Sequence, residues 1–189
     1  MNKLMVTFVL IFVMAAAVLP AQSADNPALK PILNHFGARN YANGAVSRTA
    51  LDLIVQAGIR APSASNKQPW HFTVVQNQAL VKQLVPQATD GNALIVVSAA
   101  ADNKTNTAVV LDCALAAQSM YLAAQALGLG SRLYTGPVDN VNSRFKAELG
   151  LSADHNAVII IRVGQLPADV DALSSASPRN SKDKLVTYK

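Results

Sequence analysis

The sequence predicts a domain of mixed α and β structure, either α/β or α+β, in which helices pack on a small sheet. Two kinds of pattern indicate this class: short apolar runs of strand composition, and helical patterns that lie between them. Only 14% of the 189 residues are charged, against about 25% in a typical protein, which excludes a disordered chain. Aromatic residues make up 5% and do not alternate with basic ones, so no nucleic-acid partner is expected.

The N-terminus has the pattern of a secretory signal peptide. Lys3 precedes an uncharged apolar run over residues 4–19, which is followed by Pro20 and by small residues up to Ala24. The run is short for the ~20 residues that a spanning helix needs, so no stable membrane anchor is expected. We therefore expect residues 1–23 to be removed and residues 24–189 to form one periplasmic or secreted domain.

The first half of the mature chain predicts three helices and two strands. Residues 27–36 predict a short helix with its apolar positions on one side. Ser47 is a candidate N-cap for a second helix that runs towards Arg60 and stops before Pro62. Residues 70–75 predict a strand, 77–84 a helix capped by Asn77, and 93–99 a strand buried on both faces.

The second half is dominated by one long helix, predicted over residues 108–127 and ended by Gly128. It is apolar almost all round and rich in alanine, so in a small domain it is most easily buried with a second subunit. An extended piece over 131–134, a helix over 138–149 that Gly150 ends, and a buried strand over 157–163 follow. The tail from Asp169 is polar and irregular.

The sequence nominates no catalytic residue and no metal site. The histidines are far apart in the sequence, and none has a metal-ligand partner at helical spacing. Ser63 and Ser65 lie in no nucleophile-elbow motif. Cys113 is the only cysteine, which excludes an intramolecular disulfide, and its place in an apolar helix predicts an inert thiol.

The loop over residues 60–72 carries an unusual concentration of polar and rigid residues. Ser63, Ser65, Asn66 and Gln68 offer hydroxyl and amide groups that can hydrogen-bond a flat polar heterocycle, and flanking prolines stiffen the loop. The alternative is a turn that only joins a helix to a strand. Composition alone favours that alternative.

Residues 61–72, Ala-Pro-Ser-Ala-Ser-Asn-Lys-Gln-Pro-Trp-His-Phe, closely resemble the signature of the FMN-dependent nitroreductase family. Residues 38–41 resemble the end of the family's N-terminal arginine motif. Residues 112–131 are similar to its central helix with a Gly-Leu-Gly-Ser ending, and residues 164–167 and 178–179 match later motifs. The resemblance covers nearly all of the mature chain.

The resemblance implies an α+β sheet-and-helix sandwich that forms an intertwined homodimer with FMN at the subunit interface. In such a dimer the residues of the 63–68 loop approach the flavin of the other subunit, and Gly136 lies near the reactive ring. The cofactor-binding residues that it implies are Arg39, Ser63, Ala64, Asn66, Gln68, Gly136 and Arg179.

The chain also departs from the family pattern. Members usually carry basic or hydroxyl residues where this chain has His35, Phe36 and Gly37, so we expect weaker FMN binding or a different mode of binding. Between residues 101 and 108 there is no room for an inserted lid helix, which predicts a small or open substrate pocket.

The implied function is electron transfer through FMN to a nitroaromatic, a quinone or a similar small planar acceptor. The reductant is NAD(P)H by resemblance, or an envelope electron donor if the chain is exported. The alternative is an exported flavin-binding protein, or a structural dimer, without redox turnover.

Overall fold

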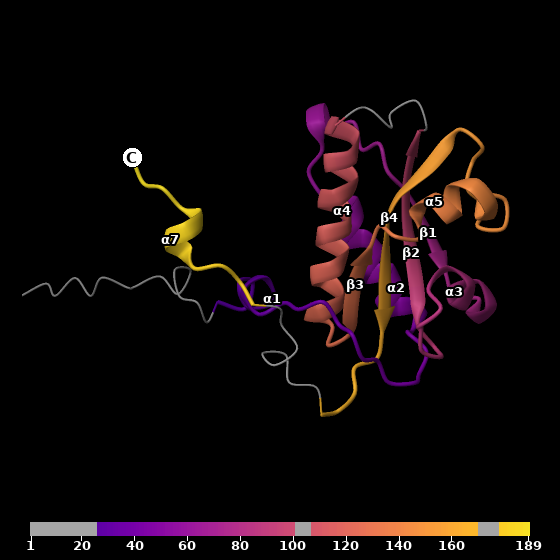
Figure 1. Cartoon of the computed structure of the whole chain (residues 1–189), viewed down its shortest axis with the longest axis horizontal. Coiled ribbons are helices and arrows are strands. Elements are labelled where there is room, and N and C mark those ends of the chain that lie inside the picture. Colours follow the sequence, from indigo (N-terminus) through magenta and orange to yellow (C-terminus); the bar gives the residue numbers. More distant parts are fainter. Residues whose placement is uncertain (1–25, 101–106, 170–177) are drawn as a thin grey trace, which may run out of the picture.

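The computed structural model describes residues 26–100, 107–169 and 178–189, so the predicted signal peptide lies outside the described residues (Figure 1). Its centre is a four-stranded sheet in the order β1-β2-β4-β3. The strands are β1 His71–Val75, β2 Ala93–Ala100, β3 Gly130–Tyr134 and β4 His155–Gly164. Every neighbouring pair is antiparallel, which makes the class α+β, as the family resemblance implied.

Two helices cover one face of the sheet. These are α2 (Arg48–Ile59) and α4 (Thr107–Ala126). Their apolar side chains, among them Ile54, Cys113 and Met120, share a core with Ile95 of β2 and Ile161 of β4. This core buries Ala93, Ile95, Val97 and Ala99, and the other residues of the buried run over 93–99 face the opposite side of the sheet.

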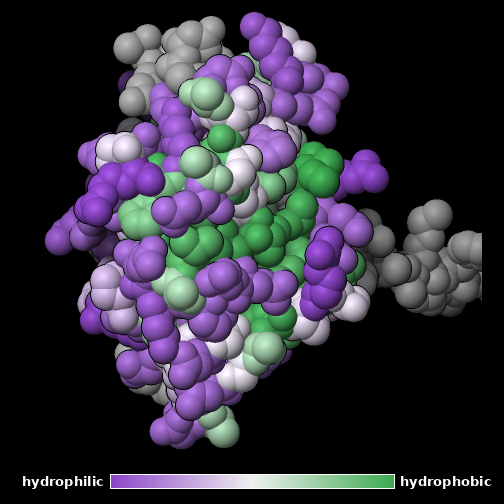
Figure 2. Space-filling view, turned by 90° about the vertical axis from the view of Figure 1, so that its right-hand side faces the viewer, coloured by the Kyte–Doolittle hydropathy of each residue, from purple (hydrophilic) through white to green (hydrophobic). Residues whose placement is uncertain are grey.

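Shorter elements cover the opposite face. They are α3 (Gln78–Leu84), α5 (Val138–Asn140) and the π-helical segment η4 (Val141–Phe145). Val81, Leu84 and Val141 pack there against Leu94 and Ile160 of the sheet. Because these elements are short, they cover this face of the sheet incompletely. Figure 2 shows an apolar band across the hollowed centre of this side of the molecule.

The predicted N-caps are confirmed. The Ser47 hydroxyl accepts from the backbone N–H of Ala50 at 3.2 Å, at the start of α2. Asn77 Oδ1 accepts from Ala79 N–H at 3.0 Å and from Leu80 N–H at 3.2 Å, at the start of α3. Each cap satisfies N–H groups that the first helical turn leaves without partners.

Other predicted boundaries are wrong. The helix expected over 27–36 shrinks to α1 (Lys30–Leu33), where Ile32 and Leu33 stay exposed and no buried face supports further turns. The helix expected over 138–149 is divided into α5, η4 and turns. The tail contains a short helix, α7 (Lys182–Leu185), and β1 begins one residue later than expected.

Apolar surface remains on α4 and α7 of this single chain. Val110, Leu111 and Leu115 form an exposed stripe on α4, opposite its buried face. Figure 1 shows α7 standing clear of the sheet, and Leu185 and Val186 beside it are exposed. Among the described residues α4 has the length and hydropathy of a membrane span, but its buried face belongs to the core between the sheet and α2.

Candidate functional site

The loop between α2 and β1 is held in a strained conformation. Ser65, Asn66 and Gln68 have φ values of 52°, 54° and 47°, in the left-handed region that residues with side chains rarely adopt. Each such residue costs roughly 1–3 kcal/mol, and such residues cluster at binding sites because the surroundings must enforce them. The loop is therefore more than a simple connection between a helix and a strand.

Hydrogen bonds within the loop enforce this shape. The Ser63 hydroxyl accepts from the backbone N–H of Gln68 at 3.0 Å. The Gln68 side-chain amide donates to Asn66 Oδ1 at 3.0 Å, so these two predicted site residues bond to each other. Ala64, Asn66 and Gln68 are exposed, and the side chains of Asn66 and Gln68 offer their remaining polar groups to solvent or to another molecule.

Asp112 anchors the loop to α4. Its Oδ1 atom accepts from the backbone N–H of Ala64 at 3.0 Å, and the residue is buried. Asp112 opens the segment that resembles the family's central helix, but the resemblance implies no separate role for it. The signal for it was an acidic residue inside an otherwise apolar helix, because a buried carboxylate needs a donor.

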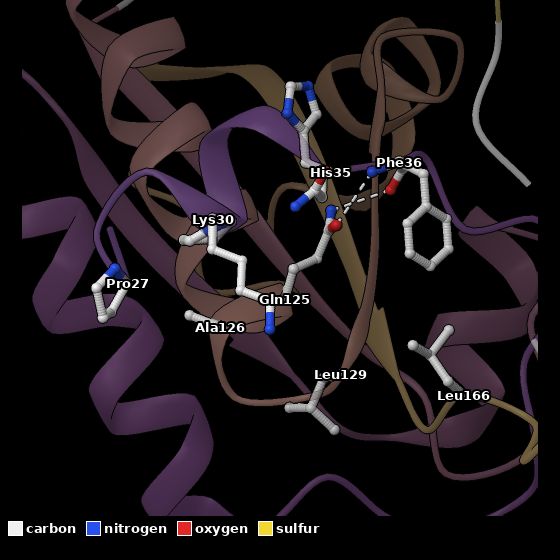
Figure 3. Close-up of a pocket in the computed structure, with 10 residues that line it drawn as sticks. Pro27, Lys30, His35, Phe36, Gln125, Ala126, Leu129 and Leu166 are labelled. Carbon is white, nitrogen blue, oxygen red and sulfur yellow. Dashed lines mark hydrogen bonds between the residues drawn. The ribbon is translucent and has the colours of Figure 1, made fainter. Parts of the chain in front are cut away.

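The segment before Arg39 is fixed at the other end of α4. The Gln125 side chain accepts from the Phe36 N–H at 3.1 Å and donates to the Phe36 carbonyl at 3.0 Å (Figure 3). The Ala38 N–H donates to the carbonyl of Ser131 in β3 at 3.0 Å. Arg39 follows directly and is exposed, free to meet an anionic group beside β3.

Arg179, which the resemblance implies as a second arginine at the cofactor, lies near Tyr121. Burial raises the pKa of Tyr121, and this effect is opposed by a bond to Gln125 and by the charge of Arg179. The ring of His35 makes an edge contact with the ring of Tyr121, with centroids 5.6 Å apart. A hollow of about 390 Å³ opens beside His35, and Lys30 is among its lining residues.

Gly136 lies two residues beyond the far end of β3. It lines a hollow of about 440 Å³ together with Tyr134, Pro137 and the segment over residues 83–87. Arg39 and Gly136 therefore flank opposite ends of the same edge strand. A ligand with an anionic end and a planar end can lie along it.

The loop over 63–68 is remote from Arg39 within one chain. Asp112 and Gln125, which anchor the two segments, are thirteen residues apart on α4, or about 20 Å at the rise of an α-helix. One copy therefore does not bring all the predicted site residues together. The resemblance implies that the loop serves the site of the other subunit, and this separation agrees with that arrangement.

A pair of arginines occupies the α3 side of β3 and β4. Arg132 is directly opposite Arg162 in the strand register. Arg162 is fully buried, and its Nε donates to Asn92 Oδ1 at 2.6 Å while Nη2 donates to Thr89 Oγ1 at 3.3 Å. Sequence reasoning overlooked Arg162, although a charged residue within the apolar run of residues 157–163 was a signal.

Tyrosine rings accompany both arginines. The guanidinium of Arg162 lies 3.8 Å from the Tyr41 ring centroid, and that of Arg132 lies 5.3 Å from the Tyr134 ring centroid. The Tyr41 ring lies over Gly130 and Gly164, where a Cβ would come within 3.0 Å of it. Burial raises the pKa of Tyr41 despite the opposing charge of Arg162, so its hydroxyl stays protonated.

The remaining candidate groups point to no metal site or nucleophile. His71 and His155, far apart in the sequence, bring their ring centroids to 6.0 Å, yet the described residues contain no cluster of three or more His, Cys, Asp or Glu. Cys113 is buried, and burial, together with Asp112, raises its pKa to about 11. The prediction of an inert thiol agrees with this environment.

The comparison with known proteins agrees with the fold. A model of the nitroreductase family matches residues 34–101 and 85–165. A curated relative from Archaeoglobus fulgidus, named as a proposed NADH dehydrogenase/NAD(P)H nitroreductase, is 30% identical over 167 residues. The match covers 83% of this chain and 95% of that relative.

Solved structures share the same architecture. A proposed nitroreductase from Desulfovibrio desulfuricans in complex with FMN is 28% identical, with a TM-score of 0.73 over 87% of this chain and 98% of that one. A nitroreductase with bound FMN from Bacteroides fragilis is 22% identical, with a TM-score of 0.72 over 87% and 99% of the two chains. With the family model matching most of its length, the chain belongs to the nitroreductase family.

Proposed function

We propose that the protein is an FMN-dependent oxidoreductase that passes electrons from a reductant to a small planar acceptor such as a nitroaromatic or a quinone. The reductant is NAD(P)H by family analogy, or an envelope electron donor if the chain is exported. The observation that carries the proposal is the strained loop over 63–68, held by Asp112, in the segment that bears the family signature. The FMN-bound relatives and the name of the Archaeoglobus relative support it.

The donor set of the chain fits an elongated anionic cofactor. Arg39 and Arg179 would hold the phosphate as charge-assisted donors, and Gly136 would offer backbone contact to the ring. Ser63, Ala64, Asn66 and Gln68 would close the site from the other subunit. When bound, FMN supplies the transfer of two electrons, while the chain binds and orients it. No side chain of this chain need act as acid or base.

The homodimer is part of this proposal. The exposed stripe of Val110, Leu111 and Leu115 on α4 would be covered by a second copy, and the projecting Leu185 and Val186 would pack on that copy. Light scattering of the mature protein should give twice the chain mass. Leu111→Glu with Leu115→Glu should give a monomer, and Leu53→Glu, on the exposed side of α2, is the matched control.

The electron-transfer proposal is tested by the spectrum of the purified protein. We expect a yellow protein that bleaches with NAD(P)H and recovers its colour when a quinone or nitroaromatic is added. A yellow protein that no reductant bleaches would support the alternative, an exported flavin-binding protein without turnover. A colourless protein that takes up no FMN would contradict the cofactor assignment.

We also propose that the protein is exported, because Lys3 and the apolar run over 4–19 form a secretory signal. Chains that cross by the general secretory route are unfolded, so FMN would be acquired after export, and an envelope donor would replace NAD(P)H there. Cell fractionation should find a species without residues 1–23 in the periplasm or the medium. An intact N-terminus on a cytoplasmic, flavin-loaded dimer would overturn this part of the proposal.

A further inference from the structure

Two arginines face each other on one side of the sheet without an acidic partner among the described residues. Arg132 and Arg162 are directly opposite on neighbouring strands, where Cβ atoms lie about 5 Å apart and like charges are destabilising. Asp90, which follows Thr89 in the sequence, pairs instead with Lys82 on α3 at 2.5 Å. The pair therefore lacks a compensating negative charge in the described part of the chain.

Hydrogen-bond donors without partners gather at the same place. Within the described residues, the buried hydroxyls of Tyr41 and Tyr134 and the Nδ2 amide of Asn92 have no hydrogen-bond partner. Tyr41 lies against Arg162, Tyr134 lies against Arg132, and Asn92 binds Arg162 through its oxygen. An unpartnered buried donor costs about 1–3 kcal/mol, so three of them in one place indicate a missing acceptor.

The cluster is accessible from one side. Arg132 and Tyr134 are half-buried, and Tyr134 also lines the hollow of about 440 Å³ beside Gly136. Arg162 and Tyr41 lie beneath them and are buried. Arg132, Arg162 and Tyr41 do not line that hollow, so an anion would reach them past the half-buried side chains of Arg132 and Tyr134. The buried surroundings of Arg162 and Tyr41 would strengthen each charge-assisted bond.

We propose that Arg132, Arg162, Tyr41 and Tyr134 form a binding site for an oxyanion of the phosphate class. A guanidinium presents two parallel N–H groups that match two oxygens of a phosphate, and phenolic hydroxyls donate to the others. The phosphate belongs either to FMN or to a separate phosphate compound. In the first case the assignment rests on the proposed function, and this cluster takes the place of Arg39 and Arg179 as the phosphate site. Neither source requires redox turnover.

Calorimetric titration of the mature protein with inorganic phosphate, at constant ionic strength in chloride, tests the site. We expect phosphate to bind in preference to chloride. Arg132→Gln should weaken phosphate binding by about tenfold to a hundredfold, the range for a lost charged hydrogen bond. Tyr134→Phe, which removes only a hydroxyl, should weaken it several-fold. Arg144→Gln, which alters an exposed arginine on η4, is the matched control and should leave it unchanged.

The same variants distinguish the two sources when titrated with FMN and with riboflavin, which lacks the phosphate. If Arg132→Gln weakens FMN binding and not riboflavin binding, the flavin supplies the phosphate. If it abolishes phosphate binding and leaves both flavin affinities unchanged, the site takes a separate phosphate compound. If wild-type protein binds no phosphate, or if Arg132→Gln and Arg144→Gln bind it equally well, the site assignment is overturned, whether or not the chain binds flavin.

Discussion

The guanidinium of Arg162 lies 3.8 Å from the centroid of the Tyr41 ring, which joins β4 to the segment that carries Arg39. The Tyr41 ring also packs closely on Gly130 and Gly164 of the sheet, because neither glycine has a side chain that would displace it. A cation stacked on a tyrosine face contributes about 0.5–2 kcal/mol, more when both are desolvated. The position of Arg39 therefore depends on contacts from β4 as well as on its own neighbours.

The close packing of other side chains against Gly164 is the basis of the first prediction. A Cβ there would lie 2.1 Å from Asn92 Nδ2 and 2.8 Å from the Tyr41 ring, so Gly164→Ala should lower the free energy of unfolding by about 1–3 kcal/mol. Urea denaturation of the flavin-free protein measures the change. Gly37→Ala, where a Cβ meets nothing within 4 Å, is the control. Equal stability of the two variants would contradict the close packing of Tyr41.

The bond from the Ala64 N–H to Asp112 gives the second prediction. Asp112→Ala should lower the free energy of unfolding by about 1–3 kcal/mol and speed hydrogen exchange in the 63–68 loop, because the strained loop loses its anchor. Asp112→Asn keeps an acceptor oxygen and should lose less. Hydrogen exchange that stays as slow in Asp112→Ala as in the wild type would show that the loop does not depend on this bond.

Cofactor affinity gives the third prediction. Arg39→Ala and Arg179→Ala should each weaken FMN binding by about tenfold or more in a flavin fluorescence titration, because each removes a charge-assisted bond to the phosphate. Arg48→Ala is the control, since Arg48 is exposed and pairs only with Asp52 one turn away among the described residues. Unchanged affinity in both variants would remove these residues from the proposed site.

The buried thiol of Cys113 gives a pH-dependent prediction. Burial raises the thiol pKa from 9.0 to about 11, so between these values the unfolded chain has lost a proton that the folded chain retains. The contribution of this thiol to the free energy of unfolding is therefore complete below pH 9 and falls as the pH rises. Near pH 10.5 the loss is about 2 kcal/mol. Urea denaturation at pH 8 and at pH 10.5 measures how much the free energy of unfolding falls between these two pH values. This fall should be smaller in Cys113→Ala than in the wild type. An identical difference in both proteins would exclude the thiol as its source.

Local signals made much of the fold predictable. Ser47 and Asn77 mark helix starts because an N-cap side chain bonds to N–H groups only two or three residues away. The run over 93–99 shows a central strand because both of its faces are buried. The failures at 27–36 and 138–149 have a different cause, since the length of a helix there depends on distant packing that periodicity does not report.

The candidate site was only partly predictable for the same reason. The loop over 63–68 was found because its residue types and order are distinctive. Arg162 and Asp112 act through Tyr41 and Ala64, which are distant in sequence, and their roles depend on strand register and on helix placement. A lone charge within an apolar run was the available signal in both cases.

The two edges of the sheet differ in how they resist unwanted association. The edge of β3 is partly covered, because Ala38 donates to Ser131 and Ala42 pairs with Gln165 at the end of β4. Within the described residues β1 is a bare edge, but it has only five residues and follows Pro69, which has no N–H to donate. A neighbouring chain can thus add only a very short strand there, which limits aggregation through edge-to-edge pairing at high concentration.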